Sequence, residues 1–367
     1  MTTETCNLLG LDQAALTAWL AARGQRAFHA RQLMAWIYRR RCTNFDAMTD
    51  LSMAFRAVLK EQARIVPPEL VDTRESRDGT RKWLLDSGTG NRVEMVFIPE
   101  ADRGTLCISS QVGCAMDCAF CATGAQGFNR NLTSAEIVGQ LWLANKLLPP
   151  RTCDLPAVSN VVFMGMGEPL ANYRNLLPAI RIFTDPLGFN LSKRRVTVST
   201  SGLVPAMDRL SEEGDVSLAI SLHAPDNALR DELVPINRRH PVEELMAACR
   251  RYIQGGTHRH VLIEYVMLDG VNDTDAHARR LARRLNGLNA KVNLIPFNPY
   301  PDARFECSSR ERIDCFREIL LNAGIMTVTR RTRGDDIEAA CGQLAGQVRD
   351  RTRHRIGARR LQSEITA

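Results

Sequence analysis

The sequence predicts an α/β protein whose core is a parallel β/α barrel, closed or partly closed. From about residue 104 onward, six short apolar, β-branched runs alternate with stretches of helical periodicity. Polar or glycine-rich residues follow these runs at once, in the order GMGEP, STSG, SLHA, DGVND and FNP. Because a β/α barrel carries its active site at the carboxyl ends of its strands, these residues form the candidate site.

The six runs define the expected strands of this core. They are Thr105–Ser110, Asn160–Met164, Arg195–Thr200, Ser217–Leu222, Val261–Met267 and Lys291–Pro296. The expected helices between and after them are Ser134–Leu148, Asn172–Phe183, Val242–Gln254, Thr274–Leu285 and Ser309–Asn322. Thr133 and Glu136 have the spacing of a capping box, and Gly324 ends the last helix.

The region before the barrel has a different character. Three amphipathic stretches, Asp12–Arg23, Ala27–Arg39 and Leu51–Ile65, predict helices, and two prolines at 67 and 68 close the region. Residues 70–99 favour extended structure. We therefore divide the chain into a helical accessory domain (1–65), an extended β segment (66–99), the core (100–336) and a C-terminal segment with a basic tail (337–367).

Composition excludes several classes of protein. The 367 residues are 44% hydrophobic and 24% charged, which is typical of a soluble globular protein and not of a disordered one. No apolar stretch is long enough to span a bilayer, and two acidic residues precede any basic one at the N-terminus, unlike a secretory signal. We expect a cytoplasmic protein with no membrane association.

Positive charge is concentrated locally. The net charge is +7, from 48 Lys and Arg against 41 Asp and Glu. Basic clusters occur at Arg39–Arg41, at Arg330, Arg331 and Arg333, and in six arginines from Arg349 to Arg360. One such run is usually solvated surface, but three runs favour a polyanionic partner.

Three of the eleven cysteines form the strongest motif, Cys114-Ala-Met-Asp-Cys118-Ala-Phe-Cys121. Three closely spaced thiolates can hold three irons of a [4Fe–4S] cluster and leave the fourth iron open. The alternative is a structural zinc site completed by Cys107 or a distant His. Zinc modules usually have a second paired half-site, which this chain lacks, so the pattern favours the cluster.

At these residues the sequence resembles a known family. The C-x3-C-x2-C loop after the first barrel strand is similar to that of radical S-adenosylmethionine (SAM) enzymes. The surrounding text, SSQVGCAMDCAFC, GFNRNL, GMGEPL, STSG, SLHAP, LDGVND and RGDDIEAACGQLAG, resembles the RlmN/Cfr family of RNA adenosine methyltransferases. The likeness runs from about Val93 to the tail, and the helical N-terminal region resembles the accessory domain of the RlmN branch.

The resemblance implies a radical SAM partial (β/α)6 barrel with a helical N-terminal accessory domain and a C-terminal catalytic tail. Its cofactors would be a [4Fe–4S] cluster on Cys114, Cys118 and Cys121, and SAM chelating the open iron. The SAM contacts that it implies are Gly167, Glu168, Ser199, Ser221, Leu222, His223 and Asn298.

The resemblance also implies a reaction that uses two SAM molecules. Cys341 takes a methyl group from the first, and a 5′-deoxyadenosyl radical made from the second removes hydrogen from that S-methyl group. The carbon radical adds to an adenine ring carbon, and Glu94 corresponds to the family's proposed proton acceptor. Cys107 then forms a disulfide with Cys341 and releases the base.

Without the resemblance, the same residues would have ordinary interpretations. Cys107 and Cys341 would be structural thiols, Glu94 would be a surface charge, and His223 would be either a core residue or a site residue.

The implied substrate is adenosine in RNA. The motifs are closer to the RlmN branch, which methylates C2 of an adenosine in the peptidyl-transferase region of 23S rRNA and, in some members, the tRNA adenosine 3′ of the anticodon. The alternatives are C8 methylation, as in the Cfr branch, and a non-catalytic metal-containing RNA-binding module. We expect Arg330, Arg331 and Arg333 to hold RNA phosphates. A flavodoxin-type electron donor and a monomeric state are also expected.

Overall fold

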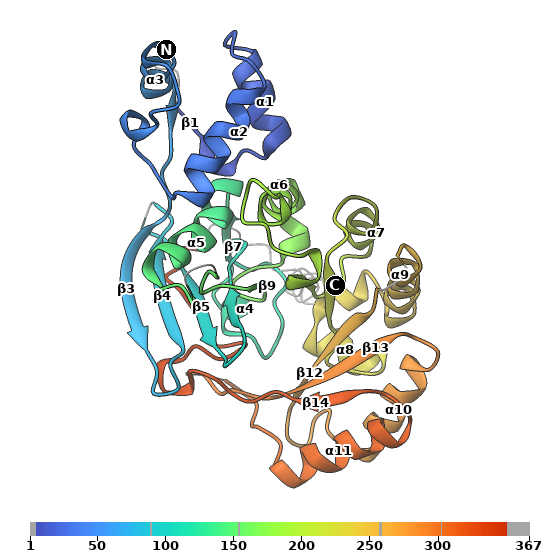
Figure 1. Ribbon diagram of the computed structural model, residues 1–367. Coiled ribbons are helices and arrows are strands. Elements are labelled where there is room, and N and C mark those ends of the chain that lie inside the picture. The colour runs from blue at the N-terminus through green and yellow to red at the C-terminus, as the bar shows by residue number, and fades with distance from the viewer. Residues whose placement is uncertain (1–4, 89, 153–154, 257–258, 302, 351–367) are drawn as a thin grey trace, which may run out of the picture.

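A ten-stranded sheet organises the computed structural model, which describes residues 5–88, 90–152, 155–256, 259–301 and 303–350 (Figure 1). The strand order is β14-β13-β12-β11-β10-β9-β6-β5-β4-β3. The strands from β6 to β14 pair in parallel and form the barrel. They are β6 (Gly104–Cys107), β9 (Asn160–Phe163), β10 (Val196–Thr200), β11 (Ser217–Ser221), β12 (Val261–Met267), β13 (Ala290–Pro296) and β14 (Thr327–Thr329). All six expected barrel strands are therefore confirmed, and β14 is an addition.

Three antiparallel strands extend the sheet beyond β6. They are β3 (Glu69–Glu75), β4 (Arg81–Asp86) and β5 (Arg92–Pro99), and they correspond to the extended region expected from the sequence. In the described part of the chain, no hydrogen-bonded ladder joins β3 to β14, so the sheet does not close on itself. The barrel is partial.

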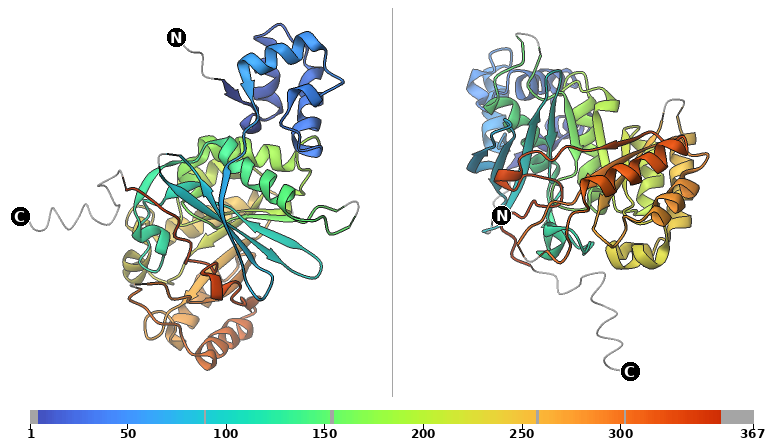
Figure 2. Two further views of the ribbon diagram at one scale, coloured as in Figure 1. Left: turned by 90° about the vertical axis from the view of Figure 1, so that its left-hand side faces the viewer. Right: turned by 90° about the horizontal axis from the view of Figure 1, so that it is seen from below.

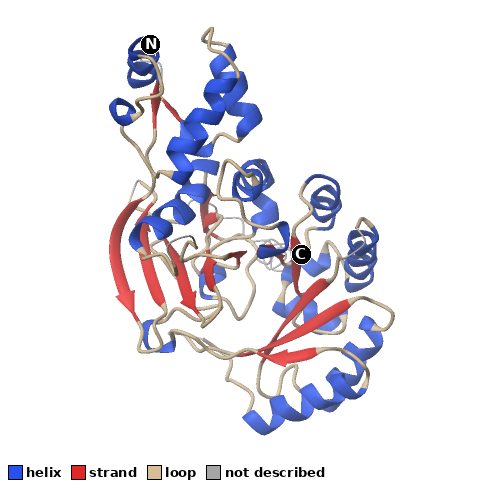
Figure 3. Ribbon diagram, in the orientation of Figure 1, coloured by secondary structure: helices blue, strands red, loops and turns tan. Residues whose placement is uncertain are grey.

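Helices cover the outer face of the parallel strands, as Figures 1 and 3 show. They include α5 (Ser134–Leu147), α6 (Tyr173–Thr184), α7 (Val204–Glu213), α9 (Val242–Gln254), α10 (Asp275–Leu285) and α11 (Arg310–Asn322). The capping box of α5 is confirmed: Thr133 Oγ1 accepts from the Glu136 N–H, and the Glu136 carboxylate accepts from the Thr133 N–H. The sequence reading missed several elements, namely α7, α4 (Ala122–Ala125), α8 (Asn227–Leu233) and the hairpin of β7 (Gln111–Gly113) with β8 (Phe128–Asn131).

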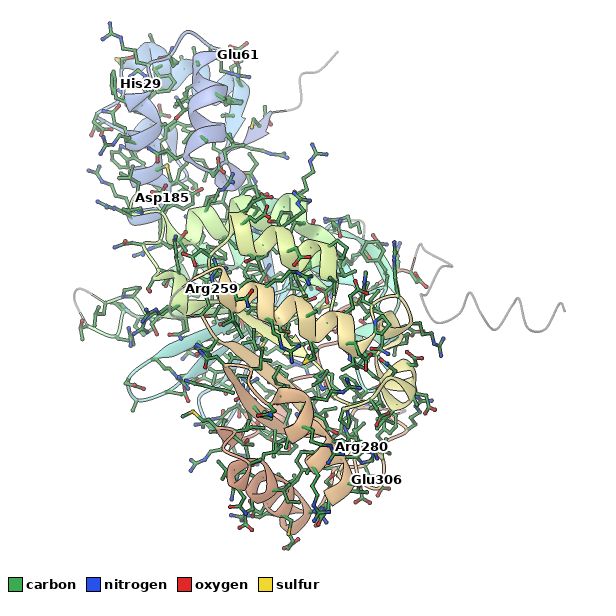
Figure 4. All side chains as sticks on the ribbon, turned by 90° about the vertical axis from the view of Figure 1, so that its right-hand side faces the viewer. His29, Glu61, Asp185, Arg259, Arg280 and Glu306 are labelled. Carbon is green, nitrogen blue, oxygen red and sulfur yellow. The ribbon has the colours of Figure 1, made fainter. Side chains whose placement is uncertain are left out.

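The N-terminal region forms a helical unit above the barrel. It contains α1 (Gln13–Ala21), α2 (Phe28–Met34) extended by a π-helical turn (Ala35–Arg39), and α3 (Met53–Gln62). Its two ends meet in a short parallel pair, β1 (Cys6–Asn7) with β2 (Ala63–Arg64), which the sequence did not predict. Trp142 of α5 donates its indole N–H to the Ile37 carbonyl at 2.8 Å, and Arg39 donates to the Pro186 carbonyl at 2.8 Å. Asp185, next to that carbonyl, lies where the unit meets the core (Figure 4).

Residues 331–350 form a segment that we call the strap, because it runs from β14 across the open side of the barrel to β5 (Figures 1 and 2). Arg92 and Gln347 exchange two backbone hydrogen bonds of 2.7 and 3.0 Å. At the other end of β3 and β4, Ser76 donates to the Asp336 carboxylate at 2.5 Å. The strap carries Cys341. The tail arginines from Arg351 onward lie outside the described residues.

Among the described helices, none has the length and apolar character needed to cross a membrane.

Candidate active site

A cavity of about 160 Å³ lies at the carboxyl ends of the strands, and three thiols line one side of it; we call it the thiol cavity. Cys114, Cys118 and Cys121 lie on the loop after β7. The loop is fixed by backbone bonds from Cys114 N to Gly127 O at 2.7 Å and from Ala119 N to Leu233 O at 3.0 Å. The structure therefore brings the three predicted ligands to one wall.

The electrostatic environment of these thiols suits the binding of an iron–sulfur cluster. Burial raises the pKa of all three, and in Cys118 the charges of Cys121 and Cys114 raise it further. Such thiols are protonated when free, and iron is the kind of cation that deprotonates coordinating thiols. The residues thus fit an iron–sulfur cluster. In the described ranges, no three His, Cys, Asp or Glu side chains are arranged to hold a single metal ion.

Gly167 and Glu168 follow β9 and also line the thiol cavity. One Glu168 carboxylate oxygen accepts from the N–H and hydroxyl of Ser201 at 2.7 and 2.8 Å, and the other accepts from the Leu170 N–H at 3.1 Å. Burial raises the pKa of Glu168, against the effect of the bonds from Ser201. Gly167 has φ +100°, and a Cβ there would lie 2.5 Å from Gln111 Cβ, so only glycine allows this approach.

His223 enters the cavity as a neutral ring. Its Nδ1 accepts from the Val266 N–H at 3.0 Å, so Nε2 carries the proton. Burial and then the charge of Arg230 lower the pKa of His223 to about 3. Its φ of +59° is the left-handed conformation that turns the chain at the end of β11. The imidazole N–H is therefore available as a donor at ordinary pH.

The other implied SAM contacts divide into two groups. Ser199 and Ser221 line the thiol cavity. Leu222 is fully buried beside it, and its carbonyl accepts from Arg230 at 3.0 Å. Asn298 lies on a second cavity instead, where its side chain donates to the Cys341 carbonyl at 3.2 Å.

This second cavity, of about 490 Å³, lies between the strands of the partial barrel and the strap, and we call it the barrel cavity. Cys107 of β6 and Cys341 of the strap both line it. It shares five lining residues with the thiol cavity, namely Met164, Glu264, Ile295, Arg330 and Cys341. Cys341 therefore lies at the boundary between the two cavities, within reach of groups bound in either.

Cys107 and Cys341 are both free thiols here, so the disulfide implied by the resemblance is not present in this structure. Burial raises the pKa of Cys107 to about 12, and the charge of Cys341 contributes. The two thiols are therefore close enough for the charge of one to affect the other. The Cys107 thiol is protonated at neutral pH in this state.

Arg330 differs from the two arginines expected to act with it. Its Nη1 lies 3.8 Å from Cys341 Sγ and 3.6 Å from Glu264 Oε2, so the guanidinium faces into the barrel. The charge of Cys341 is the largest cause of its raised pKa. Arg331 is exposed, and Arg333 forms an ion pair of 3.6 Å with Asp78. The sequence reading missed Glu264, although a lone acid in the apolar run VLIEYVM was a signal.

Glu94 lines neither of these cavities. It lies on a smaller cavity of about 130 Å³ beside the strap, where its carboxylate is 3.2 Å from Lys82 Nζ and accepts from the Ala345 N–H at 3.0 Å. The structure therefore joins Glu94 to the strap and does not bring it to the same cavity wall as Cys341. Sequence reasoning missed Lys82, which looked like an ordinary strand lysine.

Comparison with known proteins agrees with this geometry. Residues 6–65 match the family described as the ribosomal RNA large subunit methyltransferase N-terminal domain, and residues 108–282 match the radical SAM superfamily. A crystal structure of a radical SAM methyltransferase from Sphaerobacter thermophilus is 48% identical, with a TM-score of 0.86 over 92% of this chain and 99% of that one.

This chain belongs to the RlmN-type radical SAM methyltransferases.

More distant matches are much weaker. A domain of a pyruvate-formate lyase-activating enzyme from Bacteroides vulgatus is 20% identical over 47% of this chain and 99% of that one, with a TM-score of 0.37. Streptococcus suis SuiB bound to S-adenosylmethionine is 12% identical over 61% of this chain and 50% of that one, with a TM-score of 0.47.

Membership of the RlmN-type methyltransferases resolves two alternatives left by the sequence. The family uses a [4Fe–4S] cluster and SAM, which decides for the cluster over structural zinc. Its members are SAM-dependent methyltransferases, which decides against a non-catalytic RNA-binding module. The RlmN-type N-terminal domain identifies RNA as the class of substrate.

Proposed function

We propose that this enzyme methylates C2 of an adenosine in the peptidyl-transferase region of 23S rRNA, and also the tRNA adenosine 3′ of the anticodon, with Cys341 as the methyl carrier. The observation that carries the proposal is the position of Cys341 at the boundary between the thiol cavity and the barrel cavity. A sulfur in that place can receive a methyl group from one cavity and present it to a base in the other.

Cys114, Cys118 and Cys121 would hold the cluster, and Gly167, Glu168, Ser199, Ser221 and His223 would surround SAM. The bound pair supplies a 5′-deoxyadenosyl radical, which removes a hydrogen atom from a methyl group. Glu168 can accept a hydrogen bond from an ammonium group, and the His223 Nε2–H can donate one to an oxygen. Leu222 would contribute through its backbone and Asn298 through its bond to Cys341.

Cys341 performs the group transfer in this proposal. Arg330 donates a hydrogen bond of 3.8 Å to its sulfur, which would orient that sulfur towards the first methyl group. After the carbon has joined adenine, the Cys107 sulfur would attack the Cys341 sulfur and break its bond to that carbon, leaving a transient Cys107–Cys341 disulfide. The carbon would take the proton of the Cys107 thiol to complete the methyl group, and the unpaired electron would return to the cluster. An external dithiol would then reduce the disulfide before the next turnover. Glu94 would take the ring proton once the strap has moved, because in this structure its carboxylate is bonded to Lys82 and Ala345.

Each of the four segments expected from the sequence would have its own function. Residues 1–65 would bind RNA as an accessory domain, 66–99 would extend the sheet, 100–336 would form the radical SAM core and 337–367 would carry Cys341 and the basic tail. Arg331 and Arg333 would hold RNA phosphates at the mouth of the barrel cavity. We propose a cytoplasmic monomer that receives electrons from a flavodoxin-type donor.

Isotope transfer tests the proposal. Anaerobically reconstituted enzyme is given methyl-deuterated SAM, a reductant and unmodified 23S rRNA or tRNA, and the nucleosides are analysed by mass spectrometry. We expect 2-methyladenosine with two deuterium atoms, because one is lost when the S-methyl group becomes a radical. C341A should form none, and C315A, which changes an exposed cysteine, should behave as the parent. A product with three deuterium atoms would contradict the Cys341 route, and 8-methyladenosine would contradict the C2 assignment.

A further inference from the structure

Arg230 of α8 is a buried cation that the reaction as described does not use. Its side chain has no exposed surface. Burial lowers the pKa of Arg230 only to about 10, so the guanidinium is charged at neutral pH. In the described ranges of the chain, no carboxylate forms an ion pair with it within 4.0 Å. A buried charge without a counter-ion is costly, so its surroundings must explain it.

Neutral oxygens fix the position of this guanidinium. Nε donates to the Leu222 carbonyl at 3.0 Å, and Nη2 donates to the carbonyls of Ser201 and Ser221 at 2.6 and 3.1 Å. Nη1 donates to the Asn237 side chain at 3.0 Å. These contacts tie Arg230 to the carboxyl ends of β10 and β11, where the thiol cavity begins. The charge therefore cannot swing out to solvent.

The helix that carries Arg230 is joined to the loop of the cluster ligands. The Leu233 carbonyl at the end of α8 accepts a hydrogen bond of 3.0 Å from the Ala119 N–H, and Cys118 packs against the apolar cluster that contains Leu233. The nearest acid on the same helix, Asp231, accepts a hydrogen bond of 2.7 Å from Asn237. The buried charge of Arg230 is therefore held beside the cavity that the three cysteines line.

We propose that Arg230 is a positioning residue whose buried positive charge is neutralised by the iron–sulfur cluster and raises the cluster's reduction potential. The inference rests on the proposed ligation by Cys114, Cys118 and Cys121. A cluster held by three thiolates is anionic and becomes more negative on reduction, so a fixed nearby cation stabilises the reduced form. Arg230 thereby makes it easier for a donor to reduce the centre.

A redox titration of the cluster, monitored by electron paramagnetic resonance in the absence of SAM and RNA, tests this inference. In R230Q and R230M, the ratio of reduced to oxidised cluster at a fixed solution potential should fall about tenfold, which equals about 59 mV for one electron. R230K keeps the charge and should stay close to the parent. R259M is the matched control, because the Arg259 side chain is also largely buried but forms an ion pair with Asp215. Arg259 lies just before the first residue of β12 (Figure 4).

An unchanged potential in R230Q and R230M would overturn the proposal. So would a fall in R230K as large as in R230Q, since the carbonyl contacts and not the charge would then be responsible. If R230M does not retain iron, the comparison of R230Q with R230K decides, and loss of iron from R230K as well would also overturn the charge argument. Because no RNA is present, a wrong base assignment would leave this result intact.

Discussion

Lys82 and Glu94 form a buried ion pair of 3.2 Å that fastens the strap on both sides of Cys341. Lys82 Nζ also donates to the Glu338 carbonyl at 3.0 Å, and Glu94 accepts from the Ala345 N–H at 3.0 Å. The pair links neighbouring strands, β4 and β5, to residues that lie on either side of the reactive thiol. The position of Cys341 therefore depends on a charge pair outside both of its cavities.

Replacing Lys82 by Met should destabilise the protein strongly. Removing one member of a buried pair leaves the other charge unpaired, which costs about 3–5 kcal/mol of unfolding free energy. Urea denaturation of the parent and of K82M measures the difference. R81M is the control, because Arg81, on the same strand as Lys82, forms a more exposed pair with Glu75 of β3, which should contribute at most about 1 kcal/mol. Equal losses in the two variants would contradict the role assigned to Lys82.

The lowered pKa of Asp78 should make the free energy of unfolding depend on pH. Burial would raise its pKa, but hydrogen bonds from Thr80, Ser76 and the Gly334 N–H lower it from 3.8 to about 2. Because the pKa is lower in the folded state, the stabilisation is present above about pH 4 and is lost as the pH falls towards 2. D78N should be less stable than the parent at pH 7 by at most about 1 kcal/mol, because Asp78 is exposed and solvent screens its interactions.

Urea unfolding at a series of pH values checks this expectation. The difference between the parent and D78N should shrink below pH 4, whereas a difference that does not change with pH would show that Asp78 acts only through its shape. D72N, in an exposed pair with Arg74 on the neighbouring strand, should change stability little.

Cys107→Ala should trap the reaction. Without this thiol, nothing displaces the base from Cys341, so a covalent protein–RNA adduct should accumulate while Cys341 is still methylated. Denaturing gels with labelled RNA, followed by mass spectrometry of the Cys341 peptide, measure both. C249A changes another buried thiol, on α9, and should turn over normally. Normal product release by C107A would exclude Cys107 as the releasing group.

Arg330 and the two strap arginines, Arg331 and Arg333, should differ in function. R331A and R333A should weaken RNA binding and reduce the slope of log affinity against log salt by about 0.7 per lost phosphate contact with a single strand. R330A should leave that slope unchanged and reduce methylation of Cys341, because its guanidinium faces the sulfur. Filter binding over a range of salt concentrations distinguishes them. R317A, on α11, is the charge-matched control; a full loss of slope in R330A would contradict this division.

The sequence predicted the barrel well because its strands are buried and its helices are amphipathic. The boundaries of β12 and α9 agree with the expected ranges. Elements missed were those whose signal is weak. β14 has three residues, and α7 is preceded by Leu203, which provides no capping side chain to mark the helix start. The parallel pair β1–β2 joins residues far apart in the chain, which local patterns cannot show.

The sequence predicted that Cys114, Cys118 and Cys121 lie together because they are close in the chain, and the structure places all three on one cavity. The environment of Cys341 was not predictable, since it depends on contacts over long sequence separations. A run of basic residues gave Arg330, Arg331 and Arg333 the same interpretation. All three line the barrel cavity, but it is Arg330 that contacts the Cys341 sulfur. Lys82 and Arg230 are both buried charged residues, but nothing in the sequence around either residue indicates that it is buried.

The strap has a consequence for the order of folding. Its contacts to β3, β4 and β5 join residues about 250 positions apart, such as Ala345 with Glu94 and Glu338 with Lys82. Contacts of such high sequence separation carry the largest loop-closure entropy and cannot form until the last part of the chain has been synthesised. The nascent barrel therefore keeps an open side while the loop of Cys114, Cys118 and Cys121 is already complete. A chain cut within the strap before Cys341 would retain the three cysteines of that loop but lack Cys341.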